Sequence, residues 1–148
     1  MKRVWPRLAA LLAACLALPA LAQAPATPTP ALELVLTSVE HYQANGRDWT
    51  RFHYDVANKQ ALPPGLFASA PTLPPCGLNT RASRSWVDFY DMHGKRLYGF
   101  CALAQAADLA TIWFSVPEDQ VPPSWVYIEI VDRQTGTRYK SNLAETAL

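Results

Sequence analysis

Hydrophobic and polar residues alternate with a period of two along several segments of this chain. Successive side chains of a β-strand point to opposite faces of a sheet, so this period predicts strands rather than helices. The predicted strands cover residues 32–42, 49–58, 85–91, 95–101, 110–116, 125–132 and 137–142. Only short helical turns are expected, near residues 65–68 and within 102–108. The pattern therefore predicts an all-β fold, a seven-stranded antiparallel β-sandwich.

The central hairpin, residues 85–101, turns at residues 91–94, where Gly94 suits the left-handed position of a three-residue loop with a bulge. Counting outward from this loop places Tyr90 opposite Arg96. The same register gives the pairs Phe89–Leu97, Val87–Gly99 and Ser85–Cys101. One face is then core and carries Val87, Phe89, Leu97 and Cys101. The opposite face carries Trp86, Asp88, Tyr90, Arg96, Tyr98 and Phe100.

The first two predicted strands are joined by Asn45-Gly46, the strongest short-range signal for a hairpin. Pairing outward from this turn separates an apolar face from a polar one. The predicted pairs are Val39–Phe52, Thr37–Tyr54 and Val35–Val56 on the apolar face, and Glu40–Arg51 and Ser38–His53 on the polar face. Leu34 and Leu36 fall on the polar face in this register. The first strand is therefore expected to bend or to change partner midway.

The pattern also makes predictions for three other segments. A last hairpin turns at residues 134–136 and pairs Asp132 with Arg138, a cross-strand ion pair. Residues 143–148 have no predicted partner and are expected to fray. Between the second and third strands, residues 58–84 form a long loop that contains several prolines. A loop of this length predicts a functional loop, a segment that covers a sheet edge, or both.

The N-terminal residues resemble an export signal in composition. Cations at Lys2, Arg3 and Arg7 precede an apolar run over residues 8–18, and small residues follow at positions 20 and 22. This run is too short for a permanent transmembrane helix. We interpret residues 1–22 as a signal peptide of a periplasmic or secreted protein, 23–31 as a Pro/Thr/Ala-rich leader and 32–142 as one domain. Alternatively, Cys15 in Leu-Ala-Ala-Cys is the lipidated cysteine of a membrane-anchored lipoprotein.

Charge and cysteine usage change once this signal is removed. The chain carries thirteen Lys and Arg and twelve Asp and Glu, a net charge of +1. Residues 1–22 hold three of the cations and no acid, so the remainder has a charge of −2, which argues against a nucleic-acid partner. Two cysteines also remain, Cys76 and Cys101, and an even number in an exported chain predicts a disulfide. This bond would tie the proline-containing loop to the central hairpin.

No sequence motif predicts catalysis, a cofactor or a metal. The histidines do not converge in the predicted registers, and Gly-x-Ser-x-Gly is absent. The carboxylate pairs, Asp88 with Asp91 and Glu118 with Asp119, are interpreted as a hairpin edge and a solvated loop. The least favoured alternative is a small hydrolase that uses an acid-base pair centred on Asp88.

The main candidate for binding is the outward face of the central hairpin. Aromatic residues beside an arginine are typical of protein interfaces and of carbohydrate platforms. The predicted site contains Trp86, Tyr90, Arg96, Tyr98 and Phe100. Alternatively, the 58–84 loop or the other sheet covers these rings as core. A second candidate, for an anionic group or an acidic partner, consists of Arg81 and Arg84 with Lys95 and Arg96, and its alternative is a solvated edge.

The order of the predicted strands and the final hairpin at residues 127–139 resemble immunoglobulin-like and fibronectin type III domains. The resemblance covers roughly residues 32–142 and lies in the strand pattern alone, because the Cys-Trp-Cys spacing of immunoglobulins is missing. Together with the aromatic face, it predicts an exported, non-catalytic module that recognises a protein or a glycan. An inhibitor of secreted proteases is the alternative, although the Asn-Pro-Thr-Thr-Gly loop of immunoglobulin-like cysteine-protease inhibitors is absent.

Overall fold

The computed structural model describes residues 28–73, 83–101 and 103–147. Its named strands pair antiparallel in two sheets. The first sheet, in the order β1-β2-β5, consists of β1 (Leu34–Ala44), β2 (Arg47–Val56) and β5 (Ile112–Pro117). The second, in the order β4-β3-β6-β7 with β8 also paired to β6, consists of β3 (Ser85–Asp91), β4 (Arg96–Cys101), β6 (Trp125–Asp132), β7 (Arg138–Lys140) and β8 (Ala144–Glu145). The all-β prediction is confirmed, and β8 is a strand that the pattern missed.

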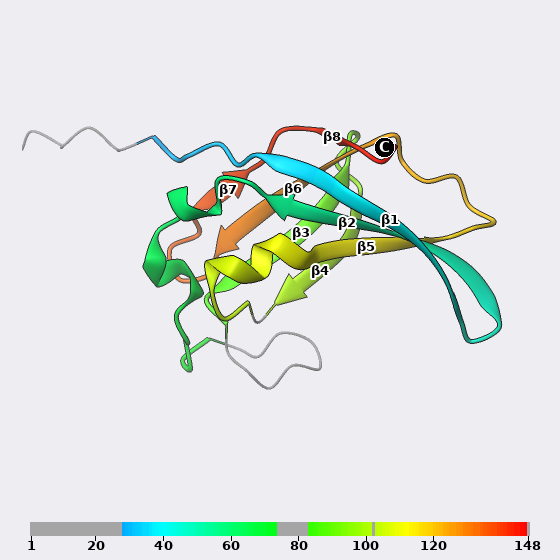
Figure 1. Cartoon of the computed structure of the whole chain (residues 1–148). Helices are drawn as coiled ribbons and strands as arrows, with labels where there is room; N and C mark the ends of the chain where they lie inside the picture. Colours follow the sequence, from blue (N-terminus) through cyan, green and yellow to red (C-terminus); the bar gives the residue numbers. More distant parts are fainter. Residues whose placement is uncertain (1–27, 74–82, 102, 148) are drawn as a thin grey trace, which may run out of the picture.

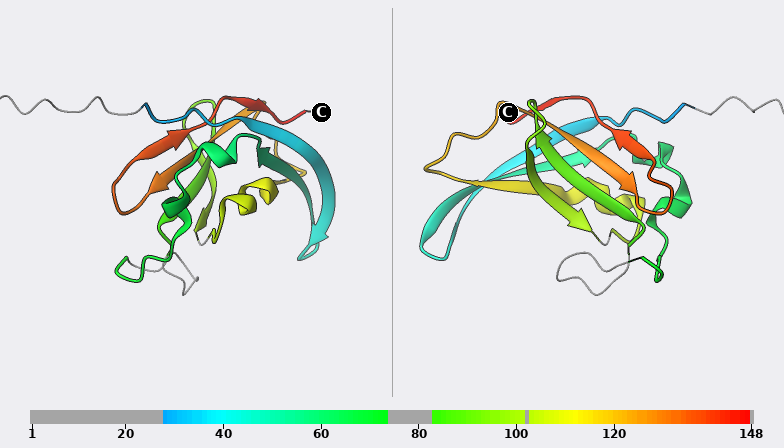
Figure 2. Two further views of the ribbon diagram at one scale, coloured as in Figure 1. Left: turned by 60° about the vertical axis from the view of Figure 1, so that its left-hand side comes forward. Right: turned by 180° about the vertical axis from the view of Figure 1, so that it is seen from behind.

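The two sheets enclose one hydrophobic core. The first sheet lies in front in Figure 1, and the view from behind in Figure 2 shows the second. Each strand points alternate side chains inward, as its sequence alternation requires. Fully buried side chains come from both sheets and include Tyr54, Phe114, Phe89, Ile128 and Ile130. The arrangement is sandwich-like, because each sheet can bury its apolar face only against the other.

Short 3₁₀ helices complete this core. Those among the described residues are η1 (Lys59–Ala61), η2 (Pro64–Phe67) and η3 (Ala106–Thr111). Leu66 and Phe67 of η2 and Leu109 of η3 are buried in the same cluster as the strands. A capping box formed by Gln105 and Asp108 starts η3. The described part of the long loop is therefore anchored to the core by a few buried side chains, whereas many of its residues are exposed.

β1 changes its register against β2 once. The pairs that follow the prediction are Val39–Phe52, Glu40–Arg51 and Ser38–His53. Beyond an irregularity between Leu36 and Ser38, the observed pairs are Leu36–Tyr54 and Leu34–Val56. The predicted partners of Thr37 and Val35 are therefore wrong. The predicted bend is confirmed, and its physical reason is that it turns Leu34 into the core.

β3 and β4 also contain a bulge, and it divides the predicted aromatic face. Tyr90 pairs with Arg96 as predicted. A register shift follows directly, and the further pairs are Phe89–Tyr98, Asp88–Gly99, Val87–Phe100 and Trp86–Cys101. Residues directly opposite each other share a face of the sheet. Tyr98 and Phe100 therefore lie on the inner side, and the prediction that they share a face with Trp86 is wrong.

The C-terminal residues join the second sheet. β7 pairs with β6 in a register shifted by one residue from the predicted one. The predicted ion pair of Asp132 with Arg138 is therefore wrong: Asp132 binds Arg84, and Arg138 binds Glu129. The expected fraying is wrong for residues 144–146, because β8 pairs with β6 and the amide of residue 146 also donates a backbone hydrogen bond.

The β1–β2 hairpin extends beyond the last pair of β2 with β5, which joins Trp49 to Pro117. We call residues 41–50 the arm, and the left view of Figure 2 shows it curving away from the rest of the sandwich. No helix in the described ranges is long and apolar enough to cross a membrane. The predicted signal peptide, Cys76, Arg81 and the side chain of Cys101 lie outside the described residues, so both the signal peptide and the disulfide stay predictions.

Candidate functional site

β3 places alternate side chains on the outer side of the second sheet. Val87 and Phe89 are buried in the core, so Trp86, Asp88 and Tyr90 point away from it. The neighbouring strands place further side chains directly beside these three. We call this surface the basic sheet face, and it consists of Trp86, Asp88, Tyr90, Arg96, Tyr127, Glu129, Arg138 and Lys140. It lies on the side that the right view of Figure 2 presents.

Asp88 connects its neighbours on the basic sheet face. Its Oδ1 accepts hydrogen bonds from Trp86 Nε1 at 2.8 Å and from Arg96 Nε at 2.6 Å. The Tyr90 hydroxyl donates to Oδ2 at 3.5 Å, and burial, with the charge of Asp88, raises the pKa of this hydroxyl. Gly99 lies opposite Asp88 on β4, and a Cβ there would collide with both members of the Asp88–Arg96 ion pair. The glycine therefore makes room for the pair.

The rings of this face are covered by cations or by other rings. Tyr90 and Tyr127 stack with their centroids 5.3 Å apart, and Lys140 Nζ lies 4.1 Å from the centroid of Tyr127. The guanidinium carbon of Arg96 lies 5.8 Å from the centroid of Trp86. Cation–aromatic contacts contribute roughly 0.5–1 kcal/mol each at exposed sites. Rings and cations therefore hold one another in place.

The acidic side chains of the basic sheet face lie deeper than the basic ones. The side chains of Asp88 and Glu129 are 13% and 17% exposed, whereas those of their partners Arg96 and Arg138 are 51% and 63% exposed. Lys140 is exposed as well. The outermost layer of this face is therefore positively charged.

The structure brings part of the predicted site together. Trp86, Tyr90 and Arg96 lie on the basic sheet face, whereas Tyr98 and Phe100 lie on the other side of the sheet. In the second predicted candidate, Arg84 makes two hydrogen bonds to Asp132, and this hydrogen bonding is the main reason that the pKa of Arg84 is raised. Arg84 precedes β3, whereas Arg96 pairs near the other end of that strand. These two arginines therefore do not form one site, and Arg81 lies outside the described residues.

Sequence reasoning missed half of the basic sheet face. The missed residues are Tyr127, Glu129, Arg138 and Lys140. Alternation in residues 125–132 already separates Tyr127 and Glu129 from the core positions. Only the pairing of β6 with β3 shows that these residues stand beside the central hairpin.

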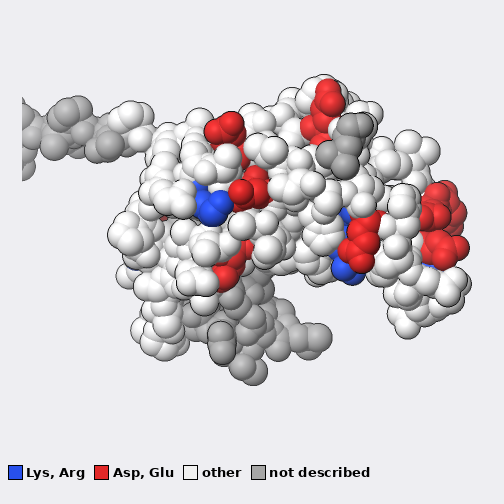
Figure 3. Space-filling view, in the orientation of Figure 1, with Lys and Arg blue, Asp and Glu red and all other residues white. Residues whose placement is uncertain are grey.

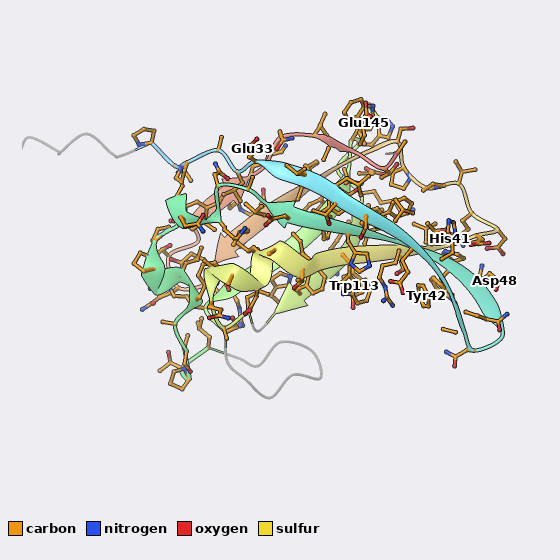
Figure 4. All side chains as sticks on the ribbon, in the orientation of Figure 1. Glu33, His41, Tyr42, Asp48, Trp113 and Glu145 are labelled. Atoms are coloured by element: carbon orange, nitrogen blue, oxygen red, sulfur yellow. The ribbon has the colours of Figure 1, made fainter. Side chains whose placement is uncertain are left out.

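A second series of rings continues from the edge of β4 to the arm. It begins with Tyr98, which stacks on Trp113 of β5 with 5.1 Å between the centroids. Arg51 lies between Trp113 and Tyr42, with its guanidinium carbon 4.5 and 4.2 Å from their centroids. Tyr42 stacks in turn on Trp49 at 6.5 Å. We call these five residues the arm stack, and in Figure 4 Tyr42 lies farther along the arm than Trp113.

Two buried donors of the arm stack, Trp49 Nε1 and Arg51 Nε, have no acceptor among the described residues. Arg51 Nη1 donates to Glu40 Oε2 at 3.3 Å, and His53 Nε2 lies 3.1 Å from the same oxygen. The hydrogen bond from His53 is the main reason that the pKa of Glu40 is lowered. Ring contacts, this carboxylate and a hydrogen bond of 3.1 Å from the Tyr42 hydroxyl to Ser115 Oγ therefore hold the arm stack.

A cleft of about 250 Å³ lies beside the arm and is lined by His41, Thr50, Val116, Pro117, Glu118, Gln120 and Pro122. His41 Nδ1 is 2.7 Å from Glu118 Oε1 and 3.3 Å from Thr50 Oγ1. A Ser-His-Asp type of triad needs the carboxylate and the hydroxyl on different nitrogens of the imidazole. Because both partners share Nδ1, this arrangement does not relay a proton between them.

Within the described ranges, no three His, Cys, Asp or Glu side chains gather as they would around a metal ion. None of the protein-family models, curated proteins and solved structures compared with this chain matches it. The geometry of these surfaces is therefore the basis for a proposal about function.

Proposed function

We propose that this chain is an exported, non-catalytic module that binds a protein partner through the basic sheet face. The observation that supports the proposal is the interleaving of rings and cations on the outer side of the second sheet, with the carboxylates beneath them. Trp, Tyr and Arg account for much of the binding free energy at protein interfaces. Side chains that their neighbours already hold in place lose little conformational entropy when a partner binds.

A protein partner fits this face better than a glycan. A sugar ring packs against the flat side of an aromatic ring and needs that side free. Tyr127 lies between Tyr90 of β3 and Lys140 of β7, and Trp86 has Arg96 against it. Charged side chains lie over the rings of Tyr127 and Trp86, and they suit the polar and charged groups of a polypeptide.

The geometry of the carboxylates favours binding over the hydrolase alternative. Asp88 accepts hydrogen bonds from Trp86 and Arg96. Asp91 Oδ1 accepts the backbone N–H groups of His93 and Lys95 within the turn. The two carboxylates belong to separate hydrogen-bond groups and do not form an acid-base pair. Each stabilises the structure next to it. The protease-inhibitor alternative has no specific observation in its favour.

The proposal includes a fibronectin type III-like fold, export and the disulfide. The sheet orders β1-β2-β5 and β4-β3-β6-β7 support the fold, because immunoglobulin-like sandwiches divide their strands between the sheets in a similar way. Mass spectrometry of the mature protein tests export and the disulfide. We expect cleavage after Ala22, no lipid and the two-hydrogen deficit of a Cys76–Cys101 bond. A chain that starts at a lipidated Cys15, or that has two free thiols, would contradict this.

Photocrosslinking in cells tests the binding surface. A photoreactive phenylalanine derivative replaces Lys140 on the basic sheet face or, in the control chain, Val35, an exposed residue of the first sheet. We expect one specific crosslinked protein from position 140 and no such product from position 35. Equal crosslinking from both positions, or no product from position 140 in a folded chain, would show that this surface does not bind a protein.

A further inference from the structure

We propose that the partner presents an acidic, extended polypeptide segment to the basic sheet face. This inference rests on the proposed protein-binding function and specifies the chemistry of the partner. Three observations support it: the distribution of charge between the two sides of the molecule, the depth of the charges on the basic sheet face, and the distance between its cations.

The two sheets differ in charge. Figure 3 shows the side of the first sheet, where acidic side chains are more frequent than basic ones. The first sheet and its flanking segments carry the acids Glu33, Glu40, Asp48, Asp55, Asp108, Glu118 and Asp119, and the cations Arg47, Arg51 and Lys59. The second sheet and its turns carry the cations Arg84, Lys95, Arg96, Arg133, Arg138 and Lys140, and the acids Asp88, Asp91, Glu129, Asp132 and Glu145. An acidic partner is therefore repelled by one side and attracted to the other.

On the basic sheet face the positive charges lie nearer to solvent than the negative ones. Arg96 and Arg138 reach outward from carboxylates that are largely covered. Lys140 lies over the ring of Tyr127 and forms no ion pair with the residues described here. A carboxylate that approaches this face meets guanidinium and ammonium groups first. The rings beneath them exclude water from one side, which strengthens the attraction.

The cations are spread across the sheet rather than gathered at one point. Arg96 is on β4, whereas Arg138 and Lys140 are on β7, and β3 and β6 lie between these strands. Neighbouring strands are about 4.8 Å apart, so the two sets of cations are separated by roughly 14 Å. An extended segment rises about 3.3 Å per residue, so carboxylates about four residues apart span a similar distance. The face therefore suits an extended acidic segment better than a single phosphate or carboxylate ion.

Fluorescence anisotropy with the purified mature chain tests this chemistry. The probes are a labelled oligo-glutamate peptide, an oligo-glutamine peptide of the same length and a single-stranded oligothymidylate. We expect the oligo-glutamate to bind more tightly than the other two probes. Its affinity should fall as added salt shortens the range of the electrostatic attraction.

Variants localise the binding. Lys140→Gln should weaken the binding of oligo-glutamate about threefold, and Lys140→Gln with Arg138→Gln about tenfold, because each exposed charge pair contributes modestly. The melting temperature of Lys140→Gln should not change. The matched control is Arg47→Gln, which removes an exposed arginine from the arm and should leave the affinity unchanged.

Three results would overturn the acidic-segment proposal. They are equal weakening by Arg47→Gln and Lys140→Gln, tighter binding of the oligothymidylate, and a salt-sensitive dimer of the chain alone in sedimentation velocity. If position 140 crosslinks to a protein but oligo-glutamate does not bind, the proposed function stands and the acidic chemistry is wrong. If neither experiment gives binding, both proposals fail.

Discussion

Asp132 is a buried carboxylate at the end of β6, with its side chain 5% exposed. It accepts hydrogen bonds from Arg84 at 2.8 and 2.6 Å, from the Thr135 hydroxyl at 2.8 Å and from the Gln134 amide at 3.0 Å. The Arg84 guanidinium holds the pKa of Asp132 well below its usual range. This one residue therefore joins the start of β3 to the 134–136 turn.

We expect Asp132→Asn to lower the free energy of unfolding by about 3 kcal/mol, because it leaves the part-buried Arg84 without its counter-charge. Chemical denaturation measures the change. The control is Asp119→Asn, which breaks an exposed pair with Arg47 and should change stability by less than about 0.5 kcal/mol. Equal losses of unfolding free energy in both variants would show that the burial of Asp132 contributes nothing to stability.

The same carboxylate predicts a dependence of stability on pH. Its pKa is lower in the folded chain than in the unfolded chain, where an aspartate titrates near about 3.9. The stabilisation is therefore complete well above about pH 4 and is lost as the pH falls toward the folded-state pKa, because the unfolded chain takes up the proton first. Asp132→Asn should flatten the stability curve below about pH 4. An unchanged acid slope in denaturation at successive pH values would contradict this.

Among the elements, the β1–β2 hairpin depends on side chains for support. A two-stranded hairpin by itself is at best marginally stable in water. Residues 43–48 extend beyond the last β2–β5 pair. The rings of Tyr42 and Trp49, the residues on either side of this segment, stack on each other. Arg51 connects these rings to Trp113 of β5. Packing across all three strands therefore supports the arm.

We expect Arg51→Ala to lower the free energy of unfolding by about 1–2 kcal/mol, since it removes two cation–aromatic contacts. Amides in residues 43–48 should also exchange hydrogen faster, because the arm opens more often. Arg47→Ala is the matched control: its guanidinium carbon lies 5.6 Å from the ring of Trp49 at the exposed end of the stack. If both variants leave exchange in the arm unchanged, the arm stack does not support it.

Across the whole molecule, the C-terminal segment connects the two sheets. β8 pairs with the start of β6 in the second sheet. The carbonyl of Glu145 accepts a hydrogen bond at 3.2 Å from the hydroxyl of Tyr54 on β2, and burial raises the pKa of this hydroxyl. The Thr146 hydroxyl donates to the Pro123 carbonyl at 2.6 Å. The segment that the sequence predicted to fray therefore closes one end of the sandwich.

Removal of residues 144–148 should lower the free energy of unfolding by about 2–3 kcal/mol. The deletion takes the hydrogen-bond partner from Tyr54 and uncovers apolar surface on β6. Thermal and chemical denaturation measure this loss, with a deletion of residues 147–148 as the control. If the longer deletion is no more harmful than the shorter one, the tail frays in solution.

Predictions from the sequence were most accurate near turns. Asn45, Gly46, Gly94 and Gly136 all have positive φ, as the predicted turns require. The pairs closest to these turns are right in the first two hairpins, and each of the two registers fails beyond a bulge. A bulge leaves the local alternation of side chains almost unchanged, so the sequence pattern does not reveal it. It forms where the sandwich must bury a particular side chain, as at Leu34. One extra residue then reverses the faces of everything beyond it.

The residues of the candidate site were predictable only where they belong to one hairpin. Trp86, Tyr90 and Arg96 were found because they lie on one side of a single hairpin. Tyr127 and Lys140 come from strands that follow much later in the chain, and their contact with that hairpin depends on which strands become neighbours. Local alternation carries no information about such neighbours.

By itself, the sequence determined the approximate positions of seven strands and of the hairpin turns, because these depend on side-chain alternation and on backbone freedom at a few positions. Tertiary structure alone decided which strands are neighbours, where bulges shift the faces and which charges are covered. These outcomes depend on burying two apolar faces against each other at the lowest cost in unpaired polar groups. The positively charged outer side of the second sheet is therefore a property of the folded molecule and of no single segment.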